Sequence, residues 1–101
     1  MRRAARKDDN HNEIVRALIS VGAIVIDLSG IGDGVPDILV GFRGQTLLLE
    51  IKDGSRSPSK RKLTEAQLKF HGNWTGGPLA IVDSVEAALR MIGVINGNRN
   101  I

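Results

Sequence analysis

The chain has 101 residues, 42% of them hydrophobic, which suits one domain with a modest core. It contains no cysteine, which excludes disulfide frameworks and thiolate zinc sites, and only His11 and His71 offer imidazole ligands. The net charge of +3 and the pI near 9.8 favour a polyanionic partner such as a nucleic acid.

The first predicted elements are a helix and a short strand. Apolar residues recur at helical spacing over about residues 9–21, and Gly22 ends the pattern. The β-branched segment 23–28 predicts a strand. The glycine-rich segment 30–34 is not a dinucleotide fingerprint, because that motif opens a helix and this segment leads into another strand. We expect a substrate-facing loop there, with Asp33 as a turn residue outside the site.

A hairpin follows, in which Arg43 and Gly44 form a two-residue turn between strands. Phe42 then faces Gln45, and the same register places Asp37 directly opposite Glu50. Cross-strand partners have Cβ atoms about 5 Å apart, where like charges are destabilising unless something compensates them. A divalent cation would compensate them, so the hairpin predicts a metal site.

The remaining elements are a helix, a strand and a helix. The helix begins at Thr64 and runs to about Trp74, residues 79–82 form a fourth strand, and a last helix runs from residue 83 or 84 to 91 or 92. The order αβββαβα predicts an α/β fold with a mixed central sheet between helices, because the strands are apolar on both faces.

Lys52 completes the constellation of charged residues, because it lies two residues after Glu50 on the same face of the strand. Two carboxylates suit Mg²⁺ or Mn²⁺, and a nearby ammonium stabilises charge on an attacked phosphate, so the trio suits phosphodiester hydrolysis. The alternative is a surface Asp-Glu-Lys cluster at a strand end. Leu39 and Leu48 flank the acids on their own face, which favours a partly buried trio.

These residues, Pro36-Asp37 followed by Glu50-Ile51-Lys52, resemble the PD-(D/E)xK nuclease superfamily. The form Gly34-x-Pro36-Asp37, an acid in the preceding helix and the later segment 63–67 make the chain similar to a stand-alone VRR-NUC domain. The resemblance implies a restriction-endonuclease-like αβββαβ core. It also implies a metal held by Asp37, Glu50, the Ile51 carbonyl and Glu13, with Lys52 serving the attacking water and Gln67 orienting phosphate or water.

Two of these residues keep a second interpretation. Glu13 fits a capping box with Asn10 as the N-cap, and Gln67 fits one with Thr64, so either side chain has a structural role available without any chemistry. His71 lies one helical turn beyond Gln67, where a general base is conceivable. We leave it out of the site, because Lys52 and a metal already supply the chemistry.

Two basic clusters are candidates for DNA contact, although each has a solvated charge run as its alternative. The first is an N-terminal arm, and the second follows Lys52 in the chain: Arg2, Arg3, Arg6 and Lys7, then Arg56, Lys60, Arg61 and Lys62. Phe70 and Trp74, together with the apolar residues near the C-terminus, either complete the core or form the interface of a homodimer. We expect a homodimer, because a symmetric dimer has two sites and can cut two strands of DNA.

The expected function is therefore a Mg²⁺- or Mn²⁺-dependent endonuclease acting on branched DNA such as Holliday junctions. The alternatives are a DNA-binding module without catalysis, an accessory protein with a structural ion, and a sequence-reading nuclease. We expect one domain over 1–101, with 1–8 and 96–101 as a flexible arm and tail. No apolar run suggests a signal peptide or membrane span, so we expect a cytoplasmic protein at the nucleoid, with no membrane contact and no organic cofactor.

Overall fold

The computed structural model describes residues 9–95 of the chain. Their elements occur in the predicted order αβββαβα. The bounds are α1 His11–Ser20, β1 Ile24–Asp27, β2 Ile38–Phe42, β3 Gln45–Ile51, η1 Pro58–Arg61, α2 Glu65–Asn73, β4 Leu79–Val82 and α3 Val85–Met91. The short 3₁₀ helix η1 was not predicted, and it lies where the sequence suggested a loop. The predicted arm 1–8 and tail 96–101 lie outside the described residues.

The four strands form one mixed sheet in the order β1-β2-β3-β4, with antiparallel pairs up to β3 and a parallel pair between β3 and β4. The predicted hairpin register is confirmed, since Phe42 pairs with Gln45 and Ile38 with Leu49. Arg43 and Gly44 have φ of 48° and 83°, as a two-residue turn that matches the twist of the strands requires.

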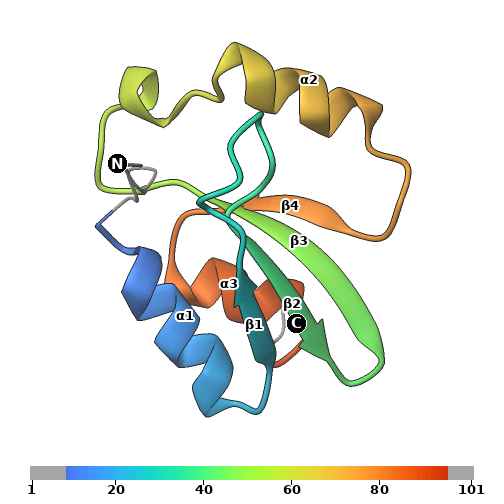
Figure 1. Ribbon diagram of the computed structural model, residues 1–101. Coiled ribbons are helices and arrows are strands. Elements are labelled where there is room, and N and C mark those ends of the chain that lie inside the picture. The colour runs from blue at the N-terminus through green and yellow to red at the C-terminus, as the bar shows by residue number, and fades with distance from the viewer. Residues whose placement is uncertain (1–8, 96–101) are drawn as a thin grey trace, which may run out of the picture.

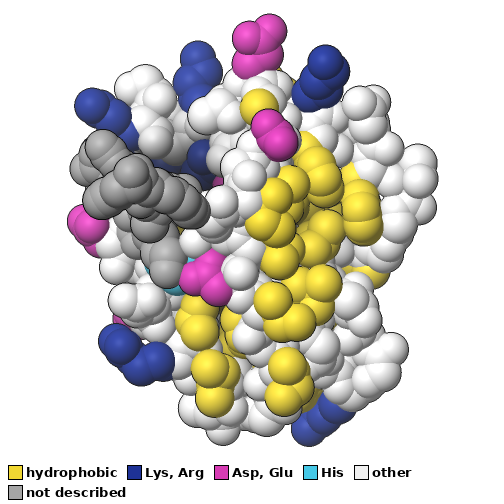
Figure 2. All heavy atoms as spheres, in the orientation of Figure 1, with side chains coloured by type: hydrophobic (Ala, Val, Ile, Leu, Met, Phe, Trp, Pro, Cys, Tyr) yellow, Lys and Arg dark blue, Asp and Glu magenta, His cyan; other side chains and the backbone are white. Residues whose placement is uncertain are grey.

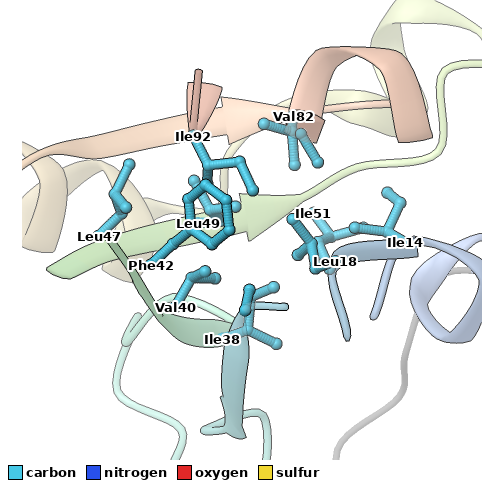
Figure 3. Packing of buried hydrophobic residues seen from close by; sticks show 12 residues of the cluster. Ile14, Leu18, Ile38, Val40, Phe42, Leu47, Leu49, Ile51, Val82 and Ile92 are labelled. Carbon is cyan, nitrogen blue, oxygen red and sulfur yellow. The ribbon is translucent and has the colours of Figure 1, made fainter. Parts of the chain in front are cut away.

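Figure 1 shows α1 and α3 on one face of the sheet and α2 across the end of the sheet at which β3 finishes. The core lies between the sheet and the helices α1 and α3. Figure 3 shows its aliphatic side chains, with Ile14 and Leu18 of α1 packed toward Ile51 and Val82 of the sheet. All four are essentially inaccessible to solvent.

The opposite face of the sheet is only partly covered. α2 is the helix on that side, and none of its residues is buried. The expectation that helices cover both faces is therefore right for one face and incomplete for the other.

Serine and threonine residues begin the later helices. Ser84 accepts a hydrogen bond from the backbone N–H of Ala87 at α3, and Thr64 accepts one from Gln67 at α2. Gly22 has φ of 102° just after α1, which explains why the helix ends there. In residues 9–95, no helix combines the length and apolar character needed to cross a membrane.

Candidate active site

Asp37 and Glu50 come together at the open end of the β2–β3 hairpin. Asp37 lies one residue before β2, so the register that pairs Ile38 with Leu49 brings it opposite Glu50. Its Oδ2 accepts a hydrogen bond of 2.7 Å from the backbone N–H of Ile51. The Glu50 side chain is 2% exposed and Asp37 is half-buried. The charged residues therefore lie in a partly buried site and not on an open surface.

Gln67 of α2 joins the acid to the lysine. Its Nε2 donates to Glu50 Oε2 at 3.0 Å, and its Oε1 accepts from Lys52 Nζ at 3.0 Å. The same Oε1 accepts from the backbone N–H of Thr64 at 2.8 Å, while Thr64 Oγ1 accepts from the Gln67 N–H at 3.1 Å. The capping-box interpretation of Gln67 is therefore confirmed, and the same side chain contacts Glu50 and Lys52, while its role toward phosphate or water stays a prediction.

His71, one turn further along α2, approaches the other oxygen of Glu50. Its Nε2 lies 3.5 Å from Glu50 Oε1. Burial, and after it the charge of Lys52, lowers the pKa of His71 below its ordinary value. A neutral imidazole is therefore favoured near pH 7. α2 presents Gln67 and His71 on one face, four residues apart, to the two oxygens of a single carboxylate.

Asn10, which the sequence suggested only as a helix cap, contacts the backbone at Lys52. Its Nδ2 donates to the carbonyl oxygens of Lys52 and Asp83 at 3.1 and 3.2 Å. Its Oδ1 is buried and has no hydrogen-bond partner within residues 9–95. Asn10 therefore anchors the start of α1 against the end of β3 and leaves a buried oxygen near Lys52.

His11 is a second residue that the sequence analysis did not place. It is 2% exposed, and its Nε2 lies 3.8 Å from Asp27 Oδ2. The periodicity contained a signal for this, since residue 11 precedes Ile14 and Leu18 at helical spacing and so belongs to the buried stripe of α1.

Glu13 lies on the other side of α1 from that stripe. It is exposed, and two residues of helix separate it from His11, which corresponds to about 200° of rotation. The Asn10 side chain makes no cap hydrogen bond, so the capping-box alternative for Glu13 is wrong. Among the interactions described for 9–95, none joins Glu13 to Asp37 or Glu50, and its metal role stays a prediction.

Gly34 holds the segment before Asp37 against α2. Its φ is +79°, and an added Cβ would lie 2.2 Å from the backbone oxygen of Ala66. No residue with a side chain fits this contact without movement of the helix or of the loop. The form Gly34-x-Pro36-Asp37 thus has a local physical reason, because the glycine lets the loop touch the first turn of the helix that carries Gln67.

The basic residues after Lys52 occupy the loop and η1. Arg56, Lys60 and Lys62 are exposed, whereas Arg61 is half-buried and its Nε donates to the Arg56 carbonyl at 2.8 Å. Exposed cations soon after the acids in the chain suit phosphate contact, and this role stays a prediction. The other predicted contacts, Arg2, Arg3, Arg6 and Lys7, lie outside the described residues.

Asp53 fixes the start of this loop. Its Oδ1 accepts hydrogen bonds from the hydroxyl and the backbone N–H of Ser55 at 2.7 and 2.9 Å. These bonds, the hydroxyl first, lower the pKa of Asp53 below its ordinary value.

The candidate ligands at the hairpin end fit a hard cation. They are the carboxylates of Asp37 and Glu50 and the Ile51 carbonyl, all of them oxygen atoms. Magnesium is typically held by one or two carboxylates, with waters and substrate phosphates completing its shell. Within 9–95 no group of three or more His, Cys, Asp and Glu side chains is arranged to hold a metal, so a site built by protein side chains alone is not indicated.

Comparison with known proteins gives a structural match. A solved structure described as a "VRR_NUC domain" superposes with a TM-score of 0.60, covering 84% of this chain and 96% of that chain at 24% identity. The chain has the fold of a VRR-NUC domain. No family model matches the sequence, and no curated protein matches it. The predicted restriction-endonuclease-like fold is therefore confirmed at the level of structure.

Proposed function

We propose that this protein is a divalent-metal-dependent DNA endonuclease that acts as a homodimer on branched DNA such as Holliday junctions. The observation that carries the proposal is the pairing of Asp37 with Glu50 at the hairpin end, with Gln67 bridging Glu50 to Lys52. The VRR-NUC-like fold supports it, because that match covers 84% of this chain.

The acids would hold Mg²⁺ or Mn²⁺ together with the Ile51 carbonyl. Such an ion supplies Lewis-acid stabilisation of the charge that grows on an attacked phosphodiester. Glu50 is buried and oriented from α2 at both of its oxygens, so its carboxylate has little freedom to rotate away. Asp37 is fixed from the other side by the Ile51 N–H.

Lys52 has the role of holding the attacking water and facing the phosphate. The Gln67 Oε1 accepts one of its ammonium protons and leaves the others for substrate or water. Asn10 supports the same residue through its backbone carbonyl. The lysine is therefore fixed at both its backbone and its side chain before substrate binds, which lowers the entropic cost of the reaction.

Selectivity for branched DNA rests on the placement of charge. The exposed cations of the described residues follow the site along the loop and η1. Phosphate contacts of this kind read the course of the backbone and not the base sequence. Two copies would present two sites to the two strands that a junction resolvase cuts.

The test is cleavage of labelled four-way junction, flap, duplex and single-stranded DNA with Mg²⁺ or Mn²⁺. We expect paired incisions on the junction by the wild type, and their loss in Asp37→Asn and Lys52→Ala. Asp83→Asn is the matched control, because Asp83 is exposed and its described contact with Asn10 uses the backbone carbonyl. Glu13→Gln tests the remaining metal prediction.

Cleavage of all substrates alike would retain the nuclease and remove the selectivity. Metal-dependent cleavage that survives in Asp37→Asn, or DNA binding with no cleavage by the wild type, would reject the catalytic assignment.

A further inference from the structure

A groove runs along α2 and has no part in the chemistry described so far. Its volume is about 400 Å³. Pockets for small ligands and cofactors are typically roughly 300–1,000 Å³, so the groove has room for one planar organic group. Its lining combines two aromatic rings and one small side chain with three polar residues: Phe70, Trp74 and Ala66, then Asp33, Lys69 and Asn73. We call these six residues the aromatic groove.

The two rings of the aromatic groove are held in place. Phe70 and Trp74 lie nearly parallel, at 17° with ring centroids 5.5 Å apart. The Trp74 Nε1 donates to the Gly77 carbonyl at 2.7 Å, and an added Cβ at Gly76 would overlap the indole, so this segment fixes the ring. Trp74 is nevertheless 40% exposed. A fixed and open aromatic surface is preorganised for stacking, because little side-chain freedom is lost when a ligand binds.

The aromatic groove adjoins the candidate active site along α2. Gln67 and His71 both approach the Glu50 carboxylate from this helix. Phe70 lies three residues after Gln67, and Trp74, the C-cap, lies three residues after His71. Residues three apart are neighbours on a helix surface, so the rings form the stripe beside the site. Seven residues of helix span about 10 Å, which equals about three nucleotides of a stacked DNA strand.

The polar residues of the aromatic groove suit the edges of a neutral ring. Asp33 accepts hydrogen bonds, Asn73 donates and accepts, and Lys69 adds one cation that the Asp33 charge balances. Figure 2 shows hydrophobic side chains gathered below α2, with acidic and basic side chains together above them. A phosphate would meet the Asp33 carboxylate inside the groove, whereas an aliphatic side chain of a protein would make no use of the polar groups. A nucleobase, with apolar faces and polar edges, fits both features.

We propose that the aromatic groove binds one unpaired nucleobase of the DNA substrate, stacked against Phe70 and Trp74 within about three nucleotides of the cleaved phosphate. Lys69 contacts the phosphate of that nucleotide outside the groove. Every base has a π-face, so such stacking tolerates all sequences. A base that is already single-stranded costs least to take out of a stack, so the groove favours DNA with an unpaired nucleotide near the branch over continuous duplex.

The first experiment uses the fluorescence of Trp74, which is the only tryptophan of the chain. A base stacked on an indole ring quenches its emission. The full chain is titrated in a metal chelator with oligodeoxythymidine and with a stable abasic strand of the same length and charge. We expect strong quenching by the first strand, little by the second, and at least about fivefold weaker binding of the abasic strand. Equal quenching or equal affinity for the two strands would overturn the proposal.

The second experiment compares variants by the fluorescence anisotropy of the same two strands carrying a label. Phe70→Leu keeps an apolar side chain and removes a ring, so most of the preference for the base-containing strand should be lost. Leu68→Ala is the control, because Leu68 is 59% exposed on α2 and does not line the groove. Lys69→Gln should weaken both strands alike and lower the salt slope by about 1, as loss of one phosphate contact requires. Far-UV circular dichroism shows whether each variant is folded.

This inference rests on the proposed function for its substrate, DNA, and deepens it by naming the part of the substrate that the chain selects. Both experiments omit the divalent cation, so they do not depend on cleavage. A folded Phe70→Leu that keeps the wild-type preference, or a Leu68→Ala that loses it, would refute the base site. Base-dependent quenching in a protein that cuts no DNA would reject the nuclease and retain the groove. Cleavage by a protein that binds both strands equally would do the reverse.

Discussion

Substitution of Gly34 by alanine should test how closely the loop before Asp37 supports α2. Gly34 has φ of +79°, and its added Cβ would meet the Ala66 oxygen at 2.2 Å, the Ala66 carbonyl carbon at 2.4 Å and the Gln67 nitrogen at 2.9 Å. All three are backbone atoms, so relief requires movement of the helix or of the loop. We expect the free energy of unfolding to fall through two separate effects.

The matched control is Gly32→Ala in the same loop. Gly32 has φ of +81° and nothing within 4 Å of an added Cβ, so alanine there meets only the cost of the left-handed backbone. That cost is about 1–2 kcal/mol. Gly34→Ala adds the overlap with backbone, which costs about 1–3 kcal/mol in well-packed sites. The expected totals are therefore about 1–2 kcal/mol for Gly32→Ala and about 2–5 kcal/mol for Gly34→Ala.

Urea unfolding followed by circular dichroism measures both values, and thermal melts should separate the variants by at least about 4 °C. Gly34→Ala should also lose cleavage beyond its loss of stability, because α2 moves away from the acids and lengthens the 3.0 Å bond from Gln67 to Glu50. Equal destabilisation by the two variants would refute this reasoning, since their backbone costs match and only the overlap differs.

Three further predictions concern the groups around the site. Thr64→Ala should lower the free energy of unfolding by about 1 kcal/mol through loss of the cap and leave most cleavage intact. Gln67→Ala should lower the free energy of unfolding by a similar amount and also reduce the cleavage rate, measured with single-turnover kinetics, at least about tenfold. Equal cleavage rates in the two variants would contradict the bridging role of Gln67. The lowered pKa of His71 means that the unfolded chain takes up its proton first, so stability should fall as pH drops below about 6.5, and His71→Gln should flatten that part of the urea midpoint profile. The lowered pKa of Asp53 adds stability that is present above the ordinary value of 3.8 and is lost as pH falls through and below it. Ser55→Ala should therefore lower the urea midpoint at neutral pH and reduce the loss of stability on the acid side. An unchanged profile of urea midpoint against pH would show that the turn does not contribute to stability.

Local geometry made much of this protein predictable from its sequence. A two-residue turn at Arg43-Gly44 fixes the hairpin register, and the alternation of a strand then decides that Asp37 meets Glu50. The helix bounds followed from glycine and from the cap residues Ser84 and Thr64, which act within one turn of the chain. In each case the distance between the residues in space is fixed by the geometry of a turn, a strand pair or a single helical turn.

Tertiary structure decided which side chains complete the site. Asn10 is 42 residues from Lys52, and Gln67 is 17 residues from Glu50, so only the packing of α1 and α2 against the sheet shows that they meet. The same packing turned Glu13 outward and buried His11, two neighbours that the sequence alone did not rank.

The partial cover of the sheet face away from α1 and α3 was settled in the same way. The pattern of β2 and β3 is apolar on both sides, and it predicts burial of both faces without saying by what. Whether helices cover a face depends on where the connections carry them after the strands end. The sequence by itself therefore determined the hairpin, its acids and the order of elements. The rest of the site and the uncovered face were decided only by the tertiary structure, because contacts between distant segments depend on how whole elements pack and not on the local backbone.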